Sequence, residues 1–128
     1  MTAKSSAWHI QLFSTAADAP VRWRLLSGNN RDMGRGVEQY VDVAAAEIAI
    51  KELQANADEL VAKVRRMEPS QWIFEIYWDG HPAAIAGHGF DRLVRCQQGM
   101  DQFLANFAAA PVGASLMVSD ARRWRSAS

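Results

Sequence analysis

The stretch that decides the fold runs from Trp72 to Met100 and reads WIFEIYWDGHPAAIAGHGFDRLVRCQQGM. It begins with an apolar run typical of a strand, Trp72 to Trp78, which the pair Asp79-Gly80 follows. Asp-Gly between two strand-like runs predicts a two-residue hairpin turn, because positive φ angles there match the twist of the flanking strands. A return strand over 83–88 and a helix that begins near Asp91 complete a unit of β-hairpin plus helix.

An earlier segment follows the same plan with many substitutions. Its first strand is Val21 to Leu26, its turn residues are Gly28-Asn29-Asn30, its return strand covers 33–40, and its helix begins near Asp42. Aligning Tyr40 with Phe90 sets small and apolar residues of the two helices opposite one another, namely Ala46 with Cys96, Ala49 with Gly99 and Ile50 with Met100. The order of elements and these positions predict two diverged copies.

The two copies resemble the YegP-like family, small bacterial proteins made of one or two β-rich repeats. The resemblance covers most of 8–107, and it rests on aromatic-rich strands, a Gly/Asn/Asp turn, an aromatic residue before each helix and short helix motifs. The residues that carry it are Arg22-Trp23-Arg24-Leu25, Trp72-Ile73-Phe74-Glu75-Ile76, Tyr40, Gly89-Phe90, Cys96-x-x-Gly99-Met100, and Ala49-Ile50 ahead of Gln54-Ala55-Asn56-Ala57. The resemblance implies units of three strands, a helix and a further strand that complete one sheet together. It carries over no catalytic motif.

We therefore expect an α+β fold in which two tandem β(3)-α-type repeats form one antiparallel sheet of six or seven strands, with two helices packed on one face. The expected boundaries are a disordered N-terminus over 1–7 and a single domain over 8–118. That domain divides into repeats 8–57 and 58–118, and a basic C-terminal tail follows over 119–128.

Residues 58–67 fit two structures. Leu60, Val64 and Met67 continue the spacing of the preceding helix, as in one long helix that presents a heptad seam. The segment also alternates between two faces like a strand, and Glu68-Pro69-Ser70-Gln71 after it is typical of a turn. We predict a strand, because a single helix over 42–67 would far exceed the usual length of about 11 to 12 residues.

Composition limits the classes of function. The chain has 128 residues, of which 49% are hydrophobic, with 14 acidic residues, 14 basic residues and one cysteine. Cancelling charges argue against a protein whose main task is to neutralise phosphates or to coat a membrane. One cysteine excludes an internal disulfide, and the first residues lack the apolar run of a signal peptide or membrane span. We expect a cytoplasmic protein without membrane contact.

Each predicted helix has one informative residue. Asp42 is placed to cap the first helix, since its carboxylate can accept hydrogen bonds from free backbone N–H groups. Cys96 falls on the apolar stripe of the second helix, predicted over 91–107. We expect a buried thiol with a raised pKa and little reactivity.

No residue is predicted to be catalytic, to bind a cofactor or to ligate a metal, so we expect no enzyme. His81, His88, Asp91 and Cys96 are close in sequence but lack the paired short spacings of a structural zinc site. His88 lies between two glycines, without a carboxylate and nucleophile in a recognisable order for general-base chemistry. Gly34-Arg35-Gly36 lacks the lysine of a P-loop and is interpreted as a strand irregularity.

The predicted interaction surface is the sheet face opposite the helices. Strand alternation sets Arg22 and Arg24 opposite Trp23, and Phe13 is a further candidate for the same face. The second copy and the basic tail extend the surface, whose predicted members are Arg22, Arg24, Ile73, Glu75, Tyr77, Arg122, Arg123, Trp124 and Arg125. Because Arg24 and Glu75 occupy equivalent places in the two copies, we expect them on one face, within reach of each other or of a shared water.

Two functions fit this surface. In the first, the chain is a non-enzymatic protein-interaction module or homodimer that uses the open sheet face or the edge of the last strand. In the second, it binds single-stranded nucleic acid weakly, with bases stacked on aromatics and arginines on phosphates. Zero net charge and Glu75 in the middle of the face favour the first and make nucleic acid the weaker prediction.

Overall fold

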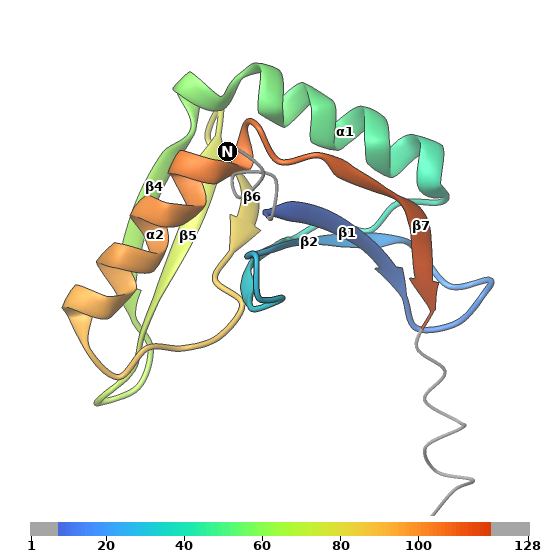
Figure 1. Cartoon of the computed structure of the whole chain (residues 1–128). Helices are drawn as coiled ribbons and strands as arrows, with labels where there is room; N and C mark the ends of the chain where they lie inside the picture. The colour runs from blue at the N-terminus through green and yellow to red at the C-terminus, as the bar shows by residue number, and fades with distance from the viewer. Residues whose placement is uncertain (1–7, 119–128) are drawn as a thin grey trace, which may run out of the picture.

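The computed structural model describes residues 8–118, which form one seven-stranded sheet and two α-helices (Figure 1). In chain order the elements are β1 (His9–Ser14), β2 (Arg22–Leu26), β3 (Asp32–Gly36), α1 (Val43–Ala55), the 3-10 helix η2 (Ala57–Glu59), β4 (Val61–Arg66), β5 (Trp72–Trp78), β6 (His81–Ile85), α2 (Leu93–Phe107) and β7 (Val112–Val118). The predicted α+β class is confirmed. The predicted disordered N-terminus and basic tail, with Arg122, Arg123, Trp124 and Arg125, lie outside the described residues.

The β5–β6 hairpin turns at the residues that the sequence indicates. Asp79 has φ 52° and Gly80 has φ 80°, so both central residues are left-handed. Trp78 pairs with His81 across the turn. This conformation suits a two-residue turn between right-twisted strands, and only Gly80 adopts it without steric cost. The return strand β6 ends at Ile85, earlier than the predicted residue 88.

Within the ambiguous segment over 58–67, residues Val61–Arg66 form a strand, as predicted. Helix α1 ends at Ala55, the short η2 helix follows, and β4 then pairs antiparallel with β5. The register runs from Val61 opposite Tyr77 to Arg66 opposite Trp72. The long-helix alternative is therefore wrong for this segment.

The sheet is mixed, which corrects the expectation of an antiparallel sheet. Its strand order is β4-β5-β6-β3-β2-β1-β7, and neighbouring strands run antiparallel except β1 and β7, which are parallel. The parallel neighbours β1 and β7 come from opposite ends of the described chain, so no hairpin joins them and forces them to run antiparallel.

The two halves of the sheet are arranged alike around its centre. Strands β3 and β6 are neighbours there, flanked by β2 and β5 and then by β1 and β4. Isolated bridges occur at aligned places, Val21 with Tyr40 and Trp72 with Phe90. The alignment of the copies is consistent with these bridges, and the division into tandem repeats stays a prediction.

An aromatic core joins the sheet to α2. Trp23 of β2 stacks on Phe107 with ring centroids 5.4 Å apart, and Phe74 of β5 meets Phe103 at 5.9 Å. Figure 1 shows α1 passing above the side of the sheet that contains β1, β2 and β7, while α2 lies along β4 and β5. Ala46 and Ile50 of α1 join the same core cluster. The helices thus cover one sheet face and leave the other open.

The helix residues singled out in the sequence have their predicted environments. The Asp42 carboxylate accepts a hydrogen bond from the Ala45 backbone N–H at 2.8 Å, which caps α1. Helix α2 begins at Leu93, two residues later than predicted, and Arg92 before it makes no side-chain cap. Cys96 is a fully buried free thiol, and burial raises its pKa.

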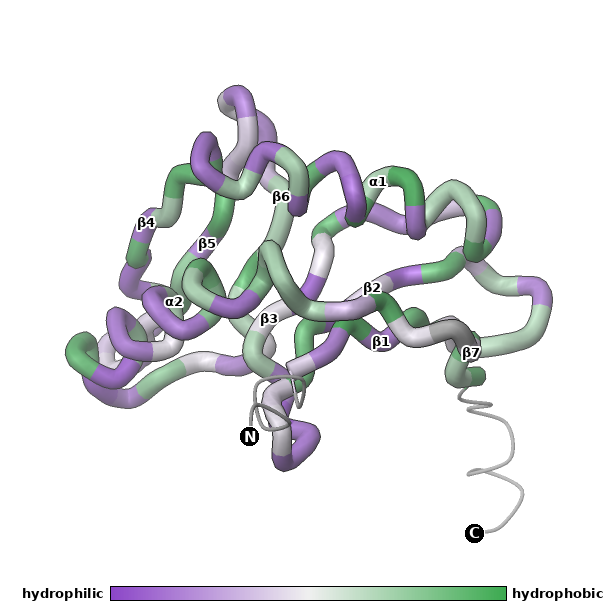
Figure 2. The backbone as a smooth tube through the Cα atoms, turned by 45° about the horizontal axis from the view of Figure 1, so that its top comes forward, coloured by the Kyte–Doolittle hydropathy of each residue, from purple (hydrophilic) through white to green (hydrophobic). Residues whose placement is uncertain are grey.

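The two outer strands of the sheet differ in charge. Strand β4 has the sequence VAKVRR and carries three basic side chains, whereas β7 has the sequence VGASLMV and carries none. Figure 2 shows purple, hydrophilic segments along β4 and a green, hydrophobic end of β7. Basic side chains discourage edge-to-edge pairing. Strand β4 is therefore the better protected edge.

Candidate functional site

The open face of the sheet carries a cross-strand row of side chains that is polar except at Ile85. The cross-strand register sets Lys63 opposite Glu75, Glu75 opposite Ile85, Ile85 opposite Arg35, Arg35 opposite Arg24, and Arg24 opposite Gln11. Trp23 and Phe74 contact α2, so the next residues along these strands, Arg24 and Glu75, point to the opposite face. The prediction that Arg24 and Glu75 share the open face is confirmed.

At one end of this row, three arginines surround one aromatic ring. The guanidinium carbons of Arg22, Arg24 and Arg35 lie 5.7, 4.9 and 6.0 Å from the ring centroid of Phe13. A guanidinium at this distance is attracted by the electron-rich face of the ring. We call Phe13, Arg22, Arg24 and Arg35 the basic cluster.

The basic cluster has more positive charge than the protein around it neutralises. Arg24 donates through Nε to the Gln11 side chain at 2.8 Å, and Arg35 forms an ion pair with Asp32. Among residues 8–118, the Nε atoms of Arg22 and Arg35 are buried and have no hydrogen-bond partner. With one carboxylate against three guanidinium groups, the basic cluster keeps a net positive charge.

At the other end of the row, Arg65 and Glu75 form an ion pair. The Arg65 guanidinium binds the Glu75 carboxylate with a distance of 3.2 Å between Nη2 and Oε2, and the Tyr77 hydroxyl donates to Glu75 at 3.3 Å. The Lys63 ammonium lies 5.1 Å from the Tyr77 ring centroid. Hydrogen bonding with Glu75, and then its charge, raises the pKa of Arg65. We call Lys63, Arg65, Glu75 and Tyr77 the paired cluster.

Two expectations for this face need correction. Ile73 is only 4% exposed and belongs to the core, so it offers little area to a partner. Arg24 and Glu75 are separated by β3 and β6, a distance of about 14 Å at about 4.8 Å per strand spacing. This separation puts them out of reach of each other, and each has a partner on its neighbouring strand instead.

Sequence reasoning missed Arg35. A Cβ atom at Gly34 would come within 2.7 Å of the Phe103 ring, and one at Gly36 would collide with the Trp23 indole. Both glycines therefore face the covered side, and Arg35 between them faces the open side. The period-two alternation within Gly34-Arg35-Gly36 was the available signal.

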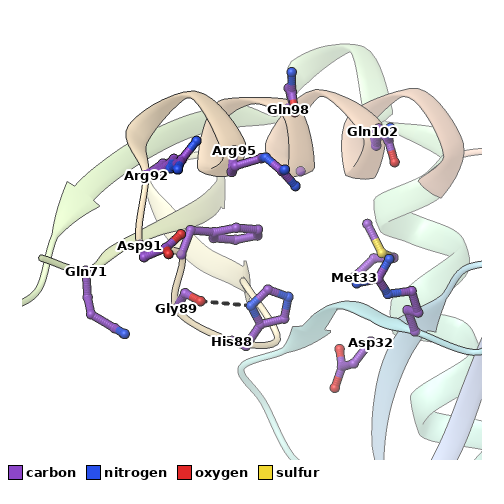
Figure 3. Close-up of a pocket in the computed structure, with 13 residues that line it drawn as sticks. Asp32, Met33, Gln71, His88, Gly89, Asp91, Arg92, Arg95, Gln98 and Gln102 are labelled. Carbon is purple, nitrogen blue, oxygen red and sulfur yellow. Dashed lines mark hydrogen bonds between the residues drawn. The ribbon is translucent and has the colours of Figure 1, made fainter.

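A second polar site lies beside α2, and Asp32, the ion-pair partner of Arg35, is part of its lining. A cleft of about 1030 Å³ is bounded by the turn before β3, the loop Gly87–Phe90 and α2 (Figure 3). The His88 ring packs on Phe90 with centroids 4.5 Å apart, and its Nδ1 lies 2.9 Å from the Gly89 carbonyl oxygen. Three arginines from two elements line the cleft: Arg31, Arg92 and Arg95. We call this space the His88 cleft.

A smaller hollow of about 300 Å³ lies between α1 and the β5–β6 hairpin. Tyr40, Trp78, Glu38 and Glu52 are among its lining residues. Burial, and then the charge of Glu38, raises the pKa of Tyr40. This hollow therefore combines aromatic and acidic side chains, in contrast to the basic lining of the His88 cleft.

Two negative findings apply to residues 8–118. No group of three or more His, Cys, Asp or Glu side chains is arranged to hold a metal ion. No helix in this part of the chain has the length and apolar character needed to cross a membrane.

The described residues form a small α+β protein whose mixed sheet is covered by helices on one face. Solved structures of other proteins share this fold. The chain is similar to yegP from E. coli, a protein of unknown function, with TM-score 0.66 and 15% identity over 85% of this chain and 93% of that one. It is also similar to a UPF0339 protein from Shewanella oneidensis, with TM-score 0.65 and 14% identity over 83% of this chain and 89% of that one. No family model and no curated protein matches the chain. The YegP-like resemblance is thus confirmed for the fold.

Proposed function

We propose that the protein is a non-enzymatic binding module whose basic cluster receives an acidic segment of a protein partner. The observation that carries this proposal is the set of three guanidinium groups around Phe13, with one carboxylate to neutralise them. Charge-assisted hydrogen bonds between arginine and carboxylate are about twice as strong as neutral ones. Carboxylates of a partner would supply the missing negative charge.

The surroundings of the basic cluster favour an extended segment. The cluster spans β1, β2 and β3 on an open sheet face, so its arginines are offered along a surface and not inside an enclosed pocket. Met117 of β7 lies beside it, since the Arg24 Nη2 atom is 3.8 Å from the Met117 sulfur. Met117 is 47% exposed and adds an apolar contact next to the charges. An acidic segment with an apolar residue fits this combination.

A second copy of the chain is a weaker candidate for the same site. A symmetric contact through the basic cluster would set arginines of one copy against arginines of the other. Like charges placed together cost several kcal/mol at an interface. The proposed partner is therefore a different, acidic protein, and the basic cluster is not proposed as a homodimer interface.

Single-stranded nucleic acid is the second candidate, favoured by the presence of Phe13, Tyr77 and arginines on one face. Two features weaken it. The guanidinium groups already lie against the Phe13 ring, on which a base would have to stack. Glu75 also lies in the same row and would repel phosphates.

The proposal is tested by fluorescence anisotropy with a labelled octaglutamate peptide and an oligo(dT) octamer at physiological salt. We expect saturable binding of the peptide and weaker binding of the oligonucleotide. Changing Arg24 to Gln removes one uncompensated charge and should weaken peptide binding about tenfold. The matched variant Arg65→Gln removes a paired charge and should leave the affinity within about twofold.

Three results would contradict the proposal. They are no saturable peptide binding, tighter binding of oligo(dT) than of the peptide, and equal losses for Arg24→Gln and Arg65→Gln. Tighter oligo(dT) binding that is lost in Arg24→Gln would make nucleic-acid binding the better conclusion.

A further inference from the structure

We propose that the His88 cleft binds a small phosphorylated molecule and that Arg31, Arg92 and Arg95 hold its phosphate group. The inference is independent of the acidic partner, because none of these arginines belongs to the basic cluster. It starts from a space of about 1030 Å³ between the turn before β3, the loop Gly87–Phe90 and α2. Small-molecule sites commonly occupy about 300 to 1,000 Å³, so the cleft can hold a phosphate together with an organic group.

The charges that line the His88 cleft favour an anion. Among residues 8–118, none of Arg31, Arg92 and Arg95 forms an ion pair. The lining contains two carboxylates, and one of them, Asp32, is already paired with Arg35. Asp91 alone opposes the three arginines, which leaves a net charge of about +2. A phosphate monoester has a charge of about −1.5 to −2 at neutral pH and would neutralise it.

The arginines come from both walls of the cleft. Arg92 and Arg95 belong to the start of α2, and Arg31 belongs to the turn before β3. Figure 3 shows Arg95 extending from α2 into the space that faces the His88 ring. Three guanidinium groups on two sides suit a tetrahedral group with three terminal oxygens better than a planar carboxylate with two.

The rest of the cleft is built to contact a polar organic group. Gln71, Gln98 and Gln102 line it, and each side-chain amide offers both donors and an acceptor. The His88 ring is held by its contact with Phe90, and its Nδ1 donates to the Gly89 carbonyl oxygen, so Nε2 is left for a ligand.

The loop that presents His88 packs closely on its neighbours. A Cβ atom at Gly87 would collide with the Asp32 carboxylate, and one at Gly89 would collide with the Gln71 amide. Gly87 thus lets the loop approach the β3 wall closely, whereas the Gln71 amide at Gly89 is the end of an exposed side chain. Pre-organisation of this kind lowers the entropy that a ligand loses on binding.

The test uses the 15N-labelled full chain titrated with phenyl phosphate, inorganic phosphate and benzoate, followed by NMR. We expect saturable shifts for amides of 88–95 with both phosphates, and at least about tenfold weaker binding of benzoate. Arg95→Gln, an exposed substitution, should weaken phenyl phosphate binding about tenfold. The matched control Lys51→Gln, which removes an exposed charge from α1, should leave it unchanged, as should Arg24→Gln.

The absence of saturable shifts around 88–95 would overturn the proposal. So would equal losses in Arg95→Gln and Lys51→Gln, because the phosphate would then respond only to the overall charge. Benzoate that binds as tightly as phenyl phosphate would overturn the assignment to phosphate. Loss of phosphate binding in Arg24→Gln would place the phosphate site at the basic cluster and not in the His88 cleft. That result would refute the phosphate proposal for the cleft without testing the acidic partner.

Discussion

The two ends of the open sheet face use the same residue types in different ways. In the paired cluster, Glu75 accepts from both Arg65 and Tyr77, so the charge of Arg65 is neutralised within the sheet. In the basic cluster, three guanidinium groups share Phe13, and the Nε atoms of Arg22 and Arg35 lack a partner among residues 8–118. Arginine content alone therefore does not identify a binding surface. We propose that the arginines left uncompensated by the fold mark the binding surface.

Reversing one charge in each cluster should give the largest difference between them. Arg24→Glu places a negative charge beside Arg22 and Arg35, and we expect acidic-peptide affinity to fall about a hundredfold, which corresponds to about 2.7 kcal/mol. Arg65→Glu sets two carboxylates together in the paired cluster and should change peptide affinity by less than about threefold. Anisotropy titrations at one salt concentration compare the variants. Similar losses in both would show that the open face acts only through its total charge.

A substitution on the covered face should lower the free energy of unfolding and leave peptide affinity unchanged. Cys96→Ser puts a hydroxyl into an apolar site, and an unsatisfied buried hydroxyl costs about 1 to 3 kcal/mol of unfolding free energy. Denaturant unfolding measures this loss, while peptide affinity should not change. In the native protein, a thiol reagent should label Cys96 slowly, since burial raises its pKa and blocks access. Fast native labelling would refute the buried position.

The contribution of the Phe13 ring is smaller. Phe13→Leu keeps an apolar side chain under the arginines but removes the aromatic face, and cation–π contacts at exposed sites are worth about 0.5 to 1 kcal/mol. We expect acidic-peptide affinity to fall about two- to fivefold, because the three guanidinium groups lose their common support. Isothermal calorimetry on the two proteins checks this. Unchanged affinity would mean that the ring does not organise the basic cluster.

Removing the carboxylate of the paired cluster, which frees Arg65, should have the smallest effect on peptide affinity. Glu75→Gln removes the carboxylate that holds Arg65, so Lys63 and Arg65 become available to an anion. The melting temperature should change little, because the ion pair is exposed to solvent. Acidic-peptide affinity should rise about twofold, and new chemical-shift changes should appear on β4. A loss of affinity would show that Glu75 supports binding directly.

Much of the fold could be predicted because it rests on local signals. The Asp79-Gly80 pair fixes a turn, Asp42 caps a helix, and alternation identifies β4 as a strand. The parallel pairing of β7 with β1 has no local signal, since the path of the chain after α2 determines it. The sequence therefore indicated the α+β fold class but not the direction of the last strand.

The candidate site could be predicted only in part. Alternation placed Arg22 and Arg24 on the open face, but the pairing of Glu75 with Arg65 depends on the β4–β5 register. The alternation within Gly34-Arg35-Gly36 indicates the face of Arg35 but not its neighbours, because the arginines of the basic cluster and of the His88 cleft come from segments distant in sequence. Which charges remain unpaired is a property of the assembled sheet.

The most direct test of the central claim maps the acidic-peptide site by NMR. In a titration of the 15N-labelled chain with octaglutamate at physiological salt, we predict saturable shifts for the backbone amides of Phe13, Arg22, Arg24 and Arg35. The chemical-shift changes of the backbone amides of Lys63, Glu75 and Tyr77 should not exceed the experimental error. Shifts centred on β4 and β5, or no saturable shifts on the open face, would contradict the account.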